Sequence, residues 1–220
     1  MSAPRLALAA SLGLRAAIGT AFVYAATHSE LPQLQDAATH ARMIAWPIGA
    51  IVVPLVLLLV RRGRPYPWLV DAALALPFAV DAVGNVLDLY ARWVSYDTVN
   101  HGISWFALAT LVASIPVLRP LPAWARAWIV AGSGAFLAIA WELGEYAAFI
   151  RSSHYGRSAY PDTLTDLLAG CSGAVLAAVL VLAAARYRRI SRAGHAGLMK
   201  GSKLAVVRMR VSTDATGEAA

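Results

Sequence analysis

The sequence predicts an all-α integral membrane protein that crosses the bilayer several times, as a bundle of about six transmembrane helices. Of its 220 residues 59% are hydrophobic and 14% are charged, with a mean hydropathy of +0.60, whereas soluble domains carry about 25% charged residues. The apolar residues form blocks of about 20, the length that an α-helix needs to cross a bilayer. The 19 basic residues lie mainly between these blocks and in the C-terminal tail. This distribution indicates membrane topology and not nucleic-acid binding.

Six blocks are long enough to be membrane spans, and together they form one expected domain, residues 1–185. They cover residues 6–26, 43–60, 68–90, 98–118, 124–150 and 163–185. The first block contains Arg15, so it could instead be a signal-like anchor or a helix that lies in the membrane interface. The tail, residues 186–220, is basic and lacks sustained periodicity, which predicts a mostly disordered cytoplasmic extension that touches anionic headgroups.

The distribution of lysine and arginine predicts that both termini are cytoplasmic. With this orientation 14 of the 19 basic residues fall in inner loops or the tail, and four fall on the outer side. Short loops that carry positive charge stay on the cytoplasmic side of the membrane. Omitting the first span moves only the N-terminus, so the orientation of the later spans does not depend on it. We therefore expect a multi-pass protein of the plasma (inner) membrane.

Acidic residues gather at one depth of the predicted bundle, in the outer half of the membrane. Seven of the twelve lie there: Asp81, Asp88, Asp97, Glu142, Glu145, Asp162 and Asp166. Spacings of three or four residues put neighbouring members on one helical face. His101 follows Asp97 at such a spacing, and Asn85 lies between Asp81 and Asp88 in the same way. Because a charged side chain at the bilayer centre costs roughly 2.5 to 3.5 kcal/mol, we expect these faces to meet in a common interior.

Helix capping is an alternative interpretation for some of these acids. Asp97 could cap the helix that it opens, and Thr163 with Asp166 matches a capping box. Glu142 and Glu145 fit this interpretation least. They lie far from a helix start and near the negative end of the helix dipole, where acids are disfavoured.

Other polar residues of the spans also have structural interpretations. Asp71 and Asp88 could be interfacial residues, and Arg15 could pair with an acid or extend toward the interface. Asp81 and Asn85 could hydrogen-bond across helices. These alternatives stay open at the level of sequence.

Three sequence blocks on successive predicted helices resemble a known family. They are YDTVNHGISWF (Tyr96 to Phe106), AWELGEY (Ala140 to Tyr146) and YPDTLTDLLAGCSGA (Tyr160 to Ala174). Their order and polar spacing resemble the YjdF-like bacterial inner-membrane proteins and, more distantly, VanZ-like proteins, which are linked to glycopeptide-antibiotic resistance. The resemblance covers roughly residues 81–182 and implies functional positions at Asp97, His101, Glu142, Glu145, Asp162 and Asp166. It concerns fold and site more than function, because the YjdF-like family has no established activity.

The residue types favour a divalent-metal site. One imidazole and several carboxylates form a ligand set suited to Zn, Mn, Fe or Mg. The expected ligands are His101, Asp97, Glu142, Glu145, Asp162 and Asp166, with Asp81, Asn85 and Asp88 in support. The first hypothesis is therefore a metal-dependent enzyme that acts on an envelope or lipid-linked substrate. Its polar catalytic centre would comprise Glu142, Glu145, Asp97, His101 and Asp166.

A transporter or a non-catalytic binding protein is the alternative. Acids inside membranes also mark proton and cation pathways, and an acidic pocket could hold a cationic ligand or a lipid headgroup. A purely structural polar network ranks third, because fixing helix register seldom needs seven acids on one side.

Overall fold

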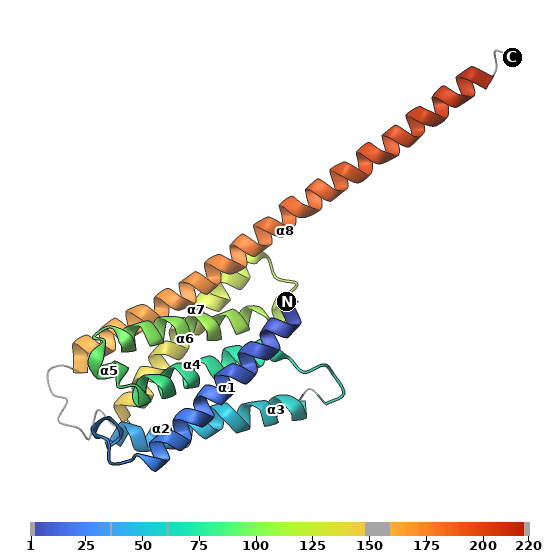
Figure 1. Ribbon diagram of the computed structural model, residues 1–220. Helices are drawn as coiled ribbons and strands as arrows, with labels where there is room; N and C mark the ends of the chain where they lie inside the picture. Colours follow the sequence, from blue (N-terminus) through green and yellow to red (C-terminus); the bar gives the residue numbers. More distant parts are fainter. Residues whose placement is uncertain (1–2, 36, 61, 148–158, 218–220) are drawn as a thin grey trace. The chain divides into compact units, whose positions relative to one another are not determined.

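The computed structural model describes residues 3–35, 37–60, 62–147 and 159–217, and the regular elements within these ranges are all helices (Figure 1). The chain divides into two compact units, Met1–Val179 and Leu180–Ala220, and the site residues discussed below lie in the first. In chain order the elements are α1 (Ala3–Thr27), η1 (Pro32–Leu34), α2 (Ala37–Pro47), η2 (Ile48–Val52), α3 (Val53–Val60), α4 (Trp68–Val86), α5 (Leu89–Arg92), α6 (Tyr96–Ala113), η3 (Pro116–Leu118), α7 (Ala123–Glu145) and α8 (Ala159–Gly217).

Five helical stretches among the described residues are long and apolar enough to cross a membrane. They are Pro4–Thr27, Thr39–Val60, Trp68–Val86, Ala123–Glu145 and Tyr160–Ser191, and they correspond to five of the six predicted spans. The remaining predicted span, residues 98–118, corresponds to α6, which is less apolar because its first half carries Asp97, Asn100 and His101. The predicted class, an all-α polytopic membrane protein, is confirmed.

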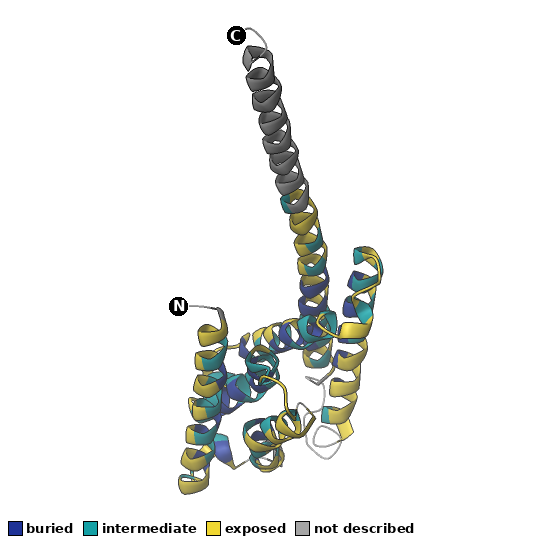
Figure 2. Cartoon of the chain, turned by 90° about the vertical axis from the view of Figure 1, so that its right-hand side faces the viewer, coloured by how far each residue is buried: buried dark blue, intermediate teal, exposed yellow. Residues whose placement is uncertain are grey.

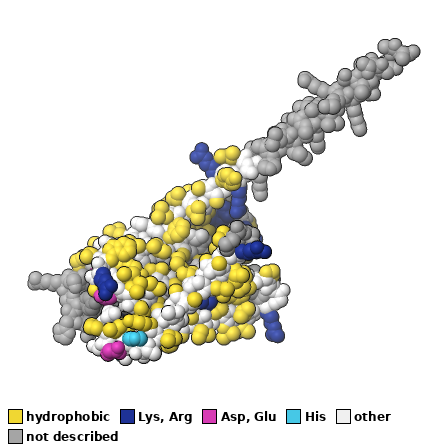
Figure 3. Space-filling view, viewed as in Figure 1, with side chains coloured by type: hydrophobic (Ala, Val, Ile, Leu, Met, Phe, Trp, Pro, Cys, Tyr) yellow, Lys and Arg dark blue, Asp and Glu magenta, His cyan; other side chains and the backbone are white. Residues whose placement is uncertain are grey.

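Large apolar side chains cover much of the surface of the helices (Figure 3). Leu59, Leu69 and Trp128, for example, are 64%, 72% and 75% exposed. A monomeric soluble protein seldom exposes apolar patches of such extent. Lipid is therefore the environment that this surface fits.

Helix α4 contacts both α1 and α6, and small residues allow its close approach to α1. Alanines 75, 79 and 82 of α4 share one buried cluster with Ile18 and with Ala21 of α1. In a membrane, helices associate through such close van der Waals contacts, because lipid supplies no hydrophobic driving force. Figure 2 shows the result, with burial concentrated on the faces that the helices turn toward one another.

A π-helical segment, Ile48–Val52, interrupts the second span between α2 and α3. In a regular helix the Ala50 carbonyl would accept a hydrogen bond from the residue four positions later, but that residue is Pro54, which has no N–H. Arg15 of α1 meets this need, because its Nη1 donates to the carbonyls of Ala50 at 2.6 Å and Gly49 at 3.2 Å. Backbone groups at this depth need such a partner within the protein, since lipid offers none.

The third span ends earlier than predicted, which corrects the expected role of Asp88. Helix α4 ends at Val86, and Asp88 adopts a left-handed conformation with φ of 56°, which aspartate tolerates better than most residues. The spacing predicted that Asp88 shares a helical face with Asp81 and Asn85, and this prediction is wrong. Its carboxylate lies 3.5 Å from the guanidinium of Arg92, which is 72% exposed.

The last helix includes most of the predicted C-terminal tail. Helix α8 continues to Gly217, and the expectation of a mostly disordered extension over residues 186–220 stays a prediction. Arginine, which is a good helix former, is the most frequent residue between positions 186 and 217. Arg151 and Arg157 of the predicted outer loop, and the predicted end of the fifth span at residues 148–150, lie outside the described residues.

Candidate functional site

His101 lies between carboxylates from two helices. It is one turn beyond Asp97 on α6, so the two side chains share a face, and Asp97 Oδ1 lies 3.6 Å from His101 Nε2. The other ring nitrogen, Nδ1, faces α7 and lies 3.3 Å from Glu142 Oε1. The imidazole is buried, with 7% of its surface exposed. Each ring nitrogen of His101 is thus directed toward a different acid.

The packing face of α7 carries Glu142 into the site. Its buried residues recur every three or four positions: Ala127, Val130, Gly134, Ala138 and Glu142. Gly134 shows how closely this face packs, because a Cβ there would lie 3.2 Å from the Cβ of Ala109 on α6. Glu142 continues the same face and is 5% exposed. Glu145, one turn later, is half-buried.

Glycines bring α8 close enough to α6 for Asp166 to enter the site. A Cβ on Gly173 would clash with the carbonyl oxygen of Gly102 and would lie 2.9 Å from the backbone nitrogen of Phe106. No larger residue fits between these two backbones. Asp166 precedes Gly173 by seven residues, which is two helical turns on the same face, and it is 3% exposed.

Two sets of three side chains have atoms close enough to share a cation. The Asp166 set comprises Asp97, His101 and Asp166, and the Glu142 set comprises His101, Glu142 and Glu145. Within each set one potential ligand atom per residue lies within 4.8 Å of the others. The sequence predicted all five residues as ligands, and the fold places them together from α6, α7 and α8.

One oxygen in each set is buried and unpartnered. Within the described part of the chain, Asp166 Oδ1 and Glu142 Oε1 have no hydrogen-bond partner. The approach of Glu142 Oε1 to His101 Nδ1 does not have the geometry of a hydrogen bond. A buried carboxylate oxygen without a donor is costly. These two atoms are therefore the strongest indication that something positive belongs in the site.

A cavity of about 430 Å³ lies beside the two sets, within the size range of about 300–1,000 Å³ that is usual for small-molecule sites. Asp97, His101 and Glu145 form part of its wall. Much of the remaining wall is apolar: Val53, Leu74, Pro77, Phe78, Trp105, Leu108 and Trp141. The cavity therefore combines a polar, acidic region with an extensive apolar one.

Asp81, predicted as a supporting residue, differs from the acids of the two sets because its carboxylate is fully partnered. It accepts hydrogen bonds from Arg42 Nε at 3.1 Å, Trp46 Nε1 at 2.7 Å and the Tyr90 hydroxyl at 2.8 Å. Asn85, the other supporting residue on α4, also donates to it at 3.2 Å. These bonds join α2, α4 and α5, so Asp81 fixes one wall of the cavity.

Sequence reasoning missed a hydrogen-bond chain that reaches Asp81 from α6. Ser104 Oγ donates to Asn100 Oδ1 at 3.0 Å, and Asn100 Nδ2 donates to the hydroxyl of Tyr90 at 3.2 Å. Tyr90 in turn donates to Asp81. The spacing of four between Asn100 and Ser104 could have placed both on the polar face of α6 that carries His101.

Asp162, also predicted as a ligand, is exposed and belongs to neither of the sets that the described residues form.

The positions of the helix starts contradict the capping interpretations of Asp97 and Thr163. Helix α8 begins at Ala159, so Thr163 lies inside it and is not its cap. Helix α6 has Ser95 as its N-cap residue, so Asp97 already lies in the first turn.

A second buried charge cluster lies between α1 and α4. Asp71, in the first turn of α4, is fully buried. It pairs with Arg15, which confirms the pairing alternative for that arginine, and it also accepts hydrogen bonds from Ser11 and from the Tyr66 hydroxyl at 2.8 Å. Burial and the bond to Asp71 raise the pKa of Tyr66, which precedes α4, to about 12. The sequence could have indicated this pair, because Arg15 and Asp71 are a base and an acid that lie within two predicted spans.

The fold and the site define the class: a helical membrane protein with a buried cluster of one histidine and several carboxylates. The chain belongs to the DUF2238 family of predicted membrane proteins, which matches residues 10–187 and so includes both sets. No curated protein and no solved structure matches the sequence. The family match supports an uncharacterised membrane family, while the YjdF-like and VanZ-like resemblance stays a prediction.

Proposed function

We propose that this protein holds a divalent metal ion between His101 and the surrounding carboxylates, and that it acts on an amphiphilic, lipid-linked substrate of the cell envelope. One observation carries the proposal. Glu142 Oε1 and Asp166 Oδ1 are buried without a hydrogen-bond partner, in sets that both include His101. A divalent cation would supply the positive charge that these oxygens lack.

The energetics favour a cation over bare carboxylates. An uncompensated charge inside a protein costs several kcal/mol even after relaxation, and the nearby Arg42 is already paired with Asp81. Nitrogen from one imidazole and oxygen from carboxylates suit Zn, Mn, Fe or Mg. A set that supplies three protein ligands would leave a coordination position for substrate. When bound, such an ion acts as a Lewis acid toward a carbonyl or phosphoryl oxygen.

The cavity supports an amphiphilic substrate. A polar group could reach Asp97, His101 and Glu145, while an apolar chain contacts walls such as Phe78 and Leu108. Because apolar side chains cover much of the helix surface (Figure 3), such a molecule would arrive from the bilayer. An envelope or lipid-linked substrate has this chemistry.

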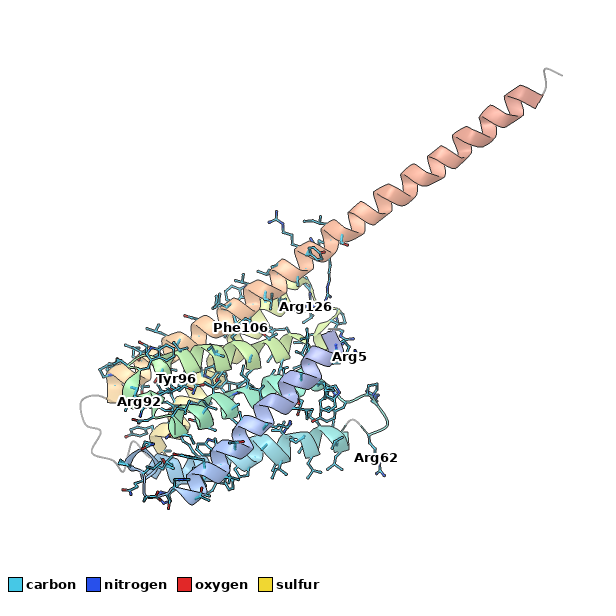
Figure 4. All side chains as sticks on the ribbon, viewed as in Figure 1. Arg5, Arg62, Arg92, Tyr96, Phe106 and Arg126 are labelled. Atoms are coloured by element: carbon cyan, nitrogen blue, oxygen red, sulfur yellow. The ribbon has the colours of Figure 1, made fainter. Side chains whose placement is uncertain are left out.

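The arrangement of basic residues supports a site in the outer half of the plasma membrane. In Figure 4, Arg5, Arg62 and Arg126 lie toward the end of the helices where α1 begins, and Arg92 and Tyr96 lie at the opposite end. The positive-inside rule assigns the first end to the cytoplasm. The site begins one residue after Tyr96, so we expect it near the outer face, with a multi-pass topology.

Metal analysis tests the proposal. The protein, purified in mild detergent without a polyhistidine tag and then dialysed against Zn²⁺ or Mn²⁺, should retain stoichiometric metal. Glu142→Gln should lower the retained amount, because glutamine loses the anionic ligand while keeping the size of the side chain. Asp162→Asn is the matched control, since Asp162 is exposed, and it should retain the wild-type amount. Failure of the wild type to retain either metal would refute the proposal.

The alternative function uses the same residues without a metal. Asp97 and Glu145 line the cavity, so a proton- or cation-coupled transporter, or a binding protein for a cationic ligand or lipid headgroup, would also place its acids here. A wild type that binds no divalent metal but supports a cation flux in proteoliposomes, lost in Glu145→Gln, would favour this alternative.

A further inference from the structure

His101 belongs to both sets, and its two ring nitrogens point to different ones. Nε2 lies 3.6 Å from Asp97 Oδ1 in the Asp166 set, and Nδ1 lies 3.3 Å from Glu142 Oε1 in the Glu142 set. A neutral imidazole can ligate a metal through one nitrogen only, and its other N–H then orients a neighbouring acceptor. A single cation ligated by His101 would therefore lie in one set, and the acids of the other set would have no cation.

Each set also has an unsatisfied atom of its own. Asp166 Oδ1 is the buried, unpartnered oxygen of one set, and Glu142 Oε1 is that of the other. The two carboxylates come from different helices, α8 and α7, and are 3% and 5% exposed. One ion bound in either set would give one of these oxygens a positive partner and leave the other oxygen buried without a partner.

The formal charge of the carboxylates in the two sets also favours two cations over one. The two sets together contain four carboxylates, Asp97, Asp166, Glu142 and Glu145. One divalent cation would offset half of their formal charge, and two would offset all of it. Arg42 also lines the cavity and is paired with the carboxylate of Asp81 at 3.1 Å, and its single charge is too small to offset four carboxylates.

We propose that the site binds two divalent cations, one in the Asp166 set and one in the Glu142 set, with His101 between them. This inference rests on the proposed metal-binding function and deepens it. His101 would ligate one ion through one ring nitrogen, and its other ring nitrogen faces a carboxylate of the other set, whose ion would be held by carboxylates alone. Two-metal sites clamp the attacking and leaving oxygens in displacement reactions, so the substrate class becomes an amphiphile with a phosphate or carboxylate ester.

Metal stoichiometry, determined by equilibrium dialysis of metal-free full-length protein against Mn²⁺, tests the inference. The wild type should bind two equivalents, and Asp166→Asn and Glu142→Gln should each bind one. The double variant should bind none, and Asp162→Asn should keep two. One equivalent in the wild type would overturn the inference and leave the proposed function intact, whereas none would overturn both.

Electron paramagnetic resonance of the Mn²⁺-loaded wild type tests the inference even where a substitution impairs folding. Two ions on either side of one imidazole should show spin–spin coupling, and each single variant that folds should show the spectrum of an isolated ion. An uncoupled spectrum in the fully loaded wild type would overturn the inference.

Discussion

Breaking the Arg15–Asp71 pair should destabilise the protein strongly. Asp71 is fully buried and Arg15 is 15% exposed, so either single substitution leaves a charge inside the bundle without its partner. Removing one member of a buried pair typically costs about 3–5 kcal/mol, and we expect Asp71→Asn and Arg15→Met to fall in this range. Arg15→Met also leaves the Ala50 carbonyl without its donor at 2.6 Å.

The double variant shows whether the charges act as a pair. With both removed, no unpaired charge remains, so the free energy of unfolding should fall by about 2 kcal/mol less than the sum of the single effects. Reversible unfolding by sodium dodecyl sulfate in mixed micelles, followed by circular dichroism, measures all four corners of this cycle. Additive effects, within about 0.5 kcal/mol, would refute the assignment of Arg15 as the charge partner of Asp71.

Two further predictions follow from the packing and from the phenol next to this pair. Gly173→Ala should lower the free energy of unfolding by about 1–3 kcal/mol, because its Cβ would meet the α6 backbone. The control Gly132→Ala has open space around its Cβ and should be neutral or stabilising. Equal effects of the two substitutions in thermal unfolding would contradict the predicted contact. Burial and a neighbouring carboxylate raise the pKa of Tyr66 to about 12, so the stability that its protonated hydroxyl contributes should be present below pH 10 and be lost as the pH rises through 12. Ultraviolet titration of the wild type against Tyr66→Phe measures this pKa, and a difference titration centred at pH 10 would contradict it.

Much of the fold could be predicted from sequence because a bilayer imposes a strong length constraint on apolar segments. Five of the six predicted spans match helices that are long and apolar enough to cross a membrane. The errors have local causes. The third span ends at Val86 because Asp88 leaves the helix in a left-handed conformation. The start of α8 at Ala159 removes the capping interpretation of Thr163.

The site could be predicted as a set of helical faces but not as a set of contacts. Spacings of three and four indicated which side chains share a face, and five of the six predicted ligands come together from three helices. Spacing does not say which helices are neighbours. For this reason spacing alone includes Asp162 among the ligands, although its side chain is exposed. Spacing also does not identify Arg15 as the partner of Asp71. The glycine contact that brings Asp166 against α6 is likewise a property of three-dimensional packing.

X-ray absorption at the zinc edge tests the central claim most directly, because it reports the atoms around a bound ion. In the Zn²⁺-loaded protein we expect nitrogen and oxygen neighbours at about 2.0–2.2 Å, with the multiple-scattering signature of an imidazole. His101→Ala should abolish that signature, while Asp162→Asn should leave it unchanged. A spectrum that contains only water oxygens, or an imidazole signature that persists without His101, would contradict a metal site built on this histidine and its carboxylates.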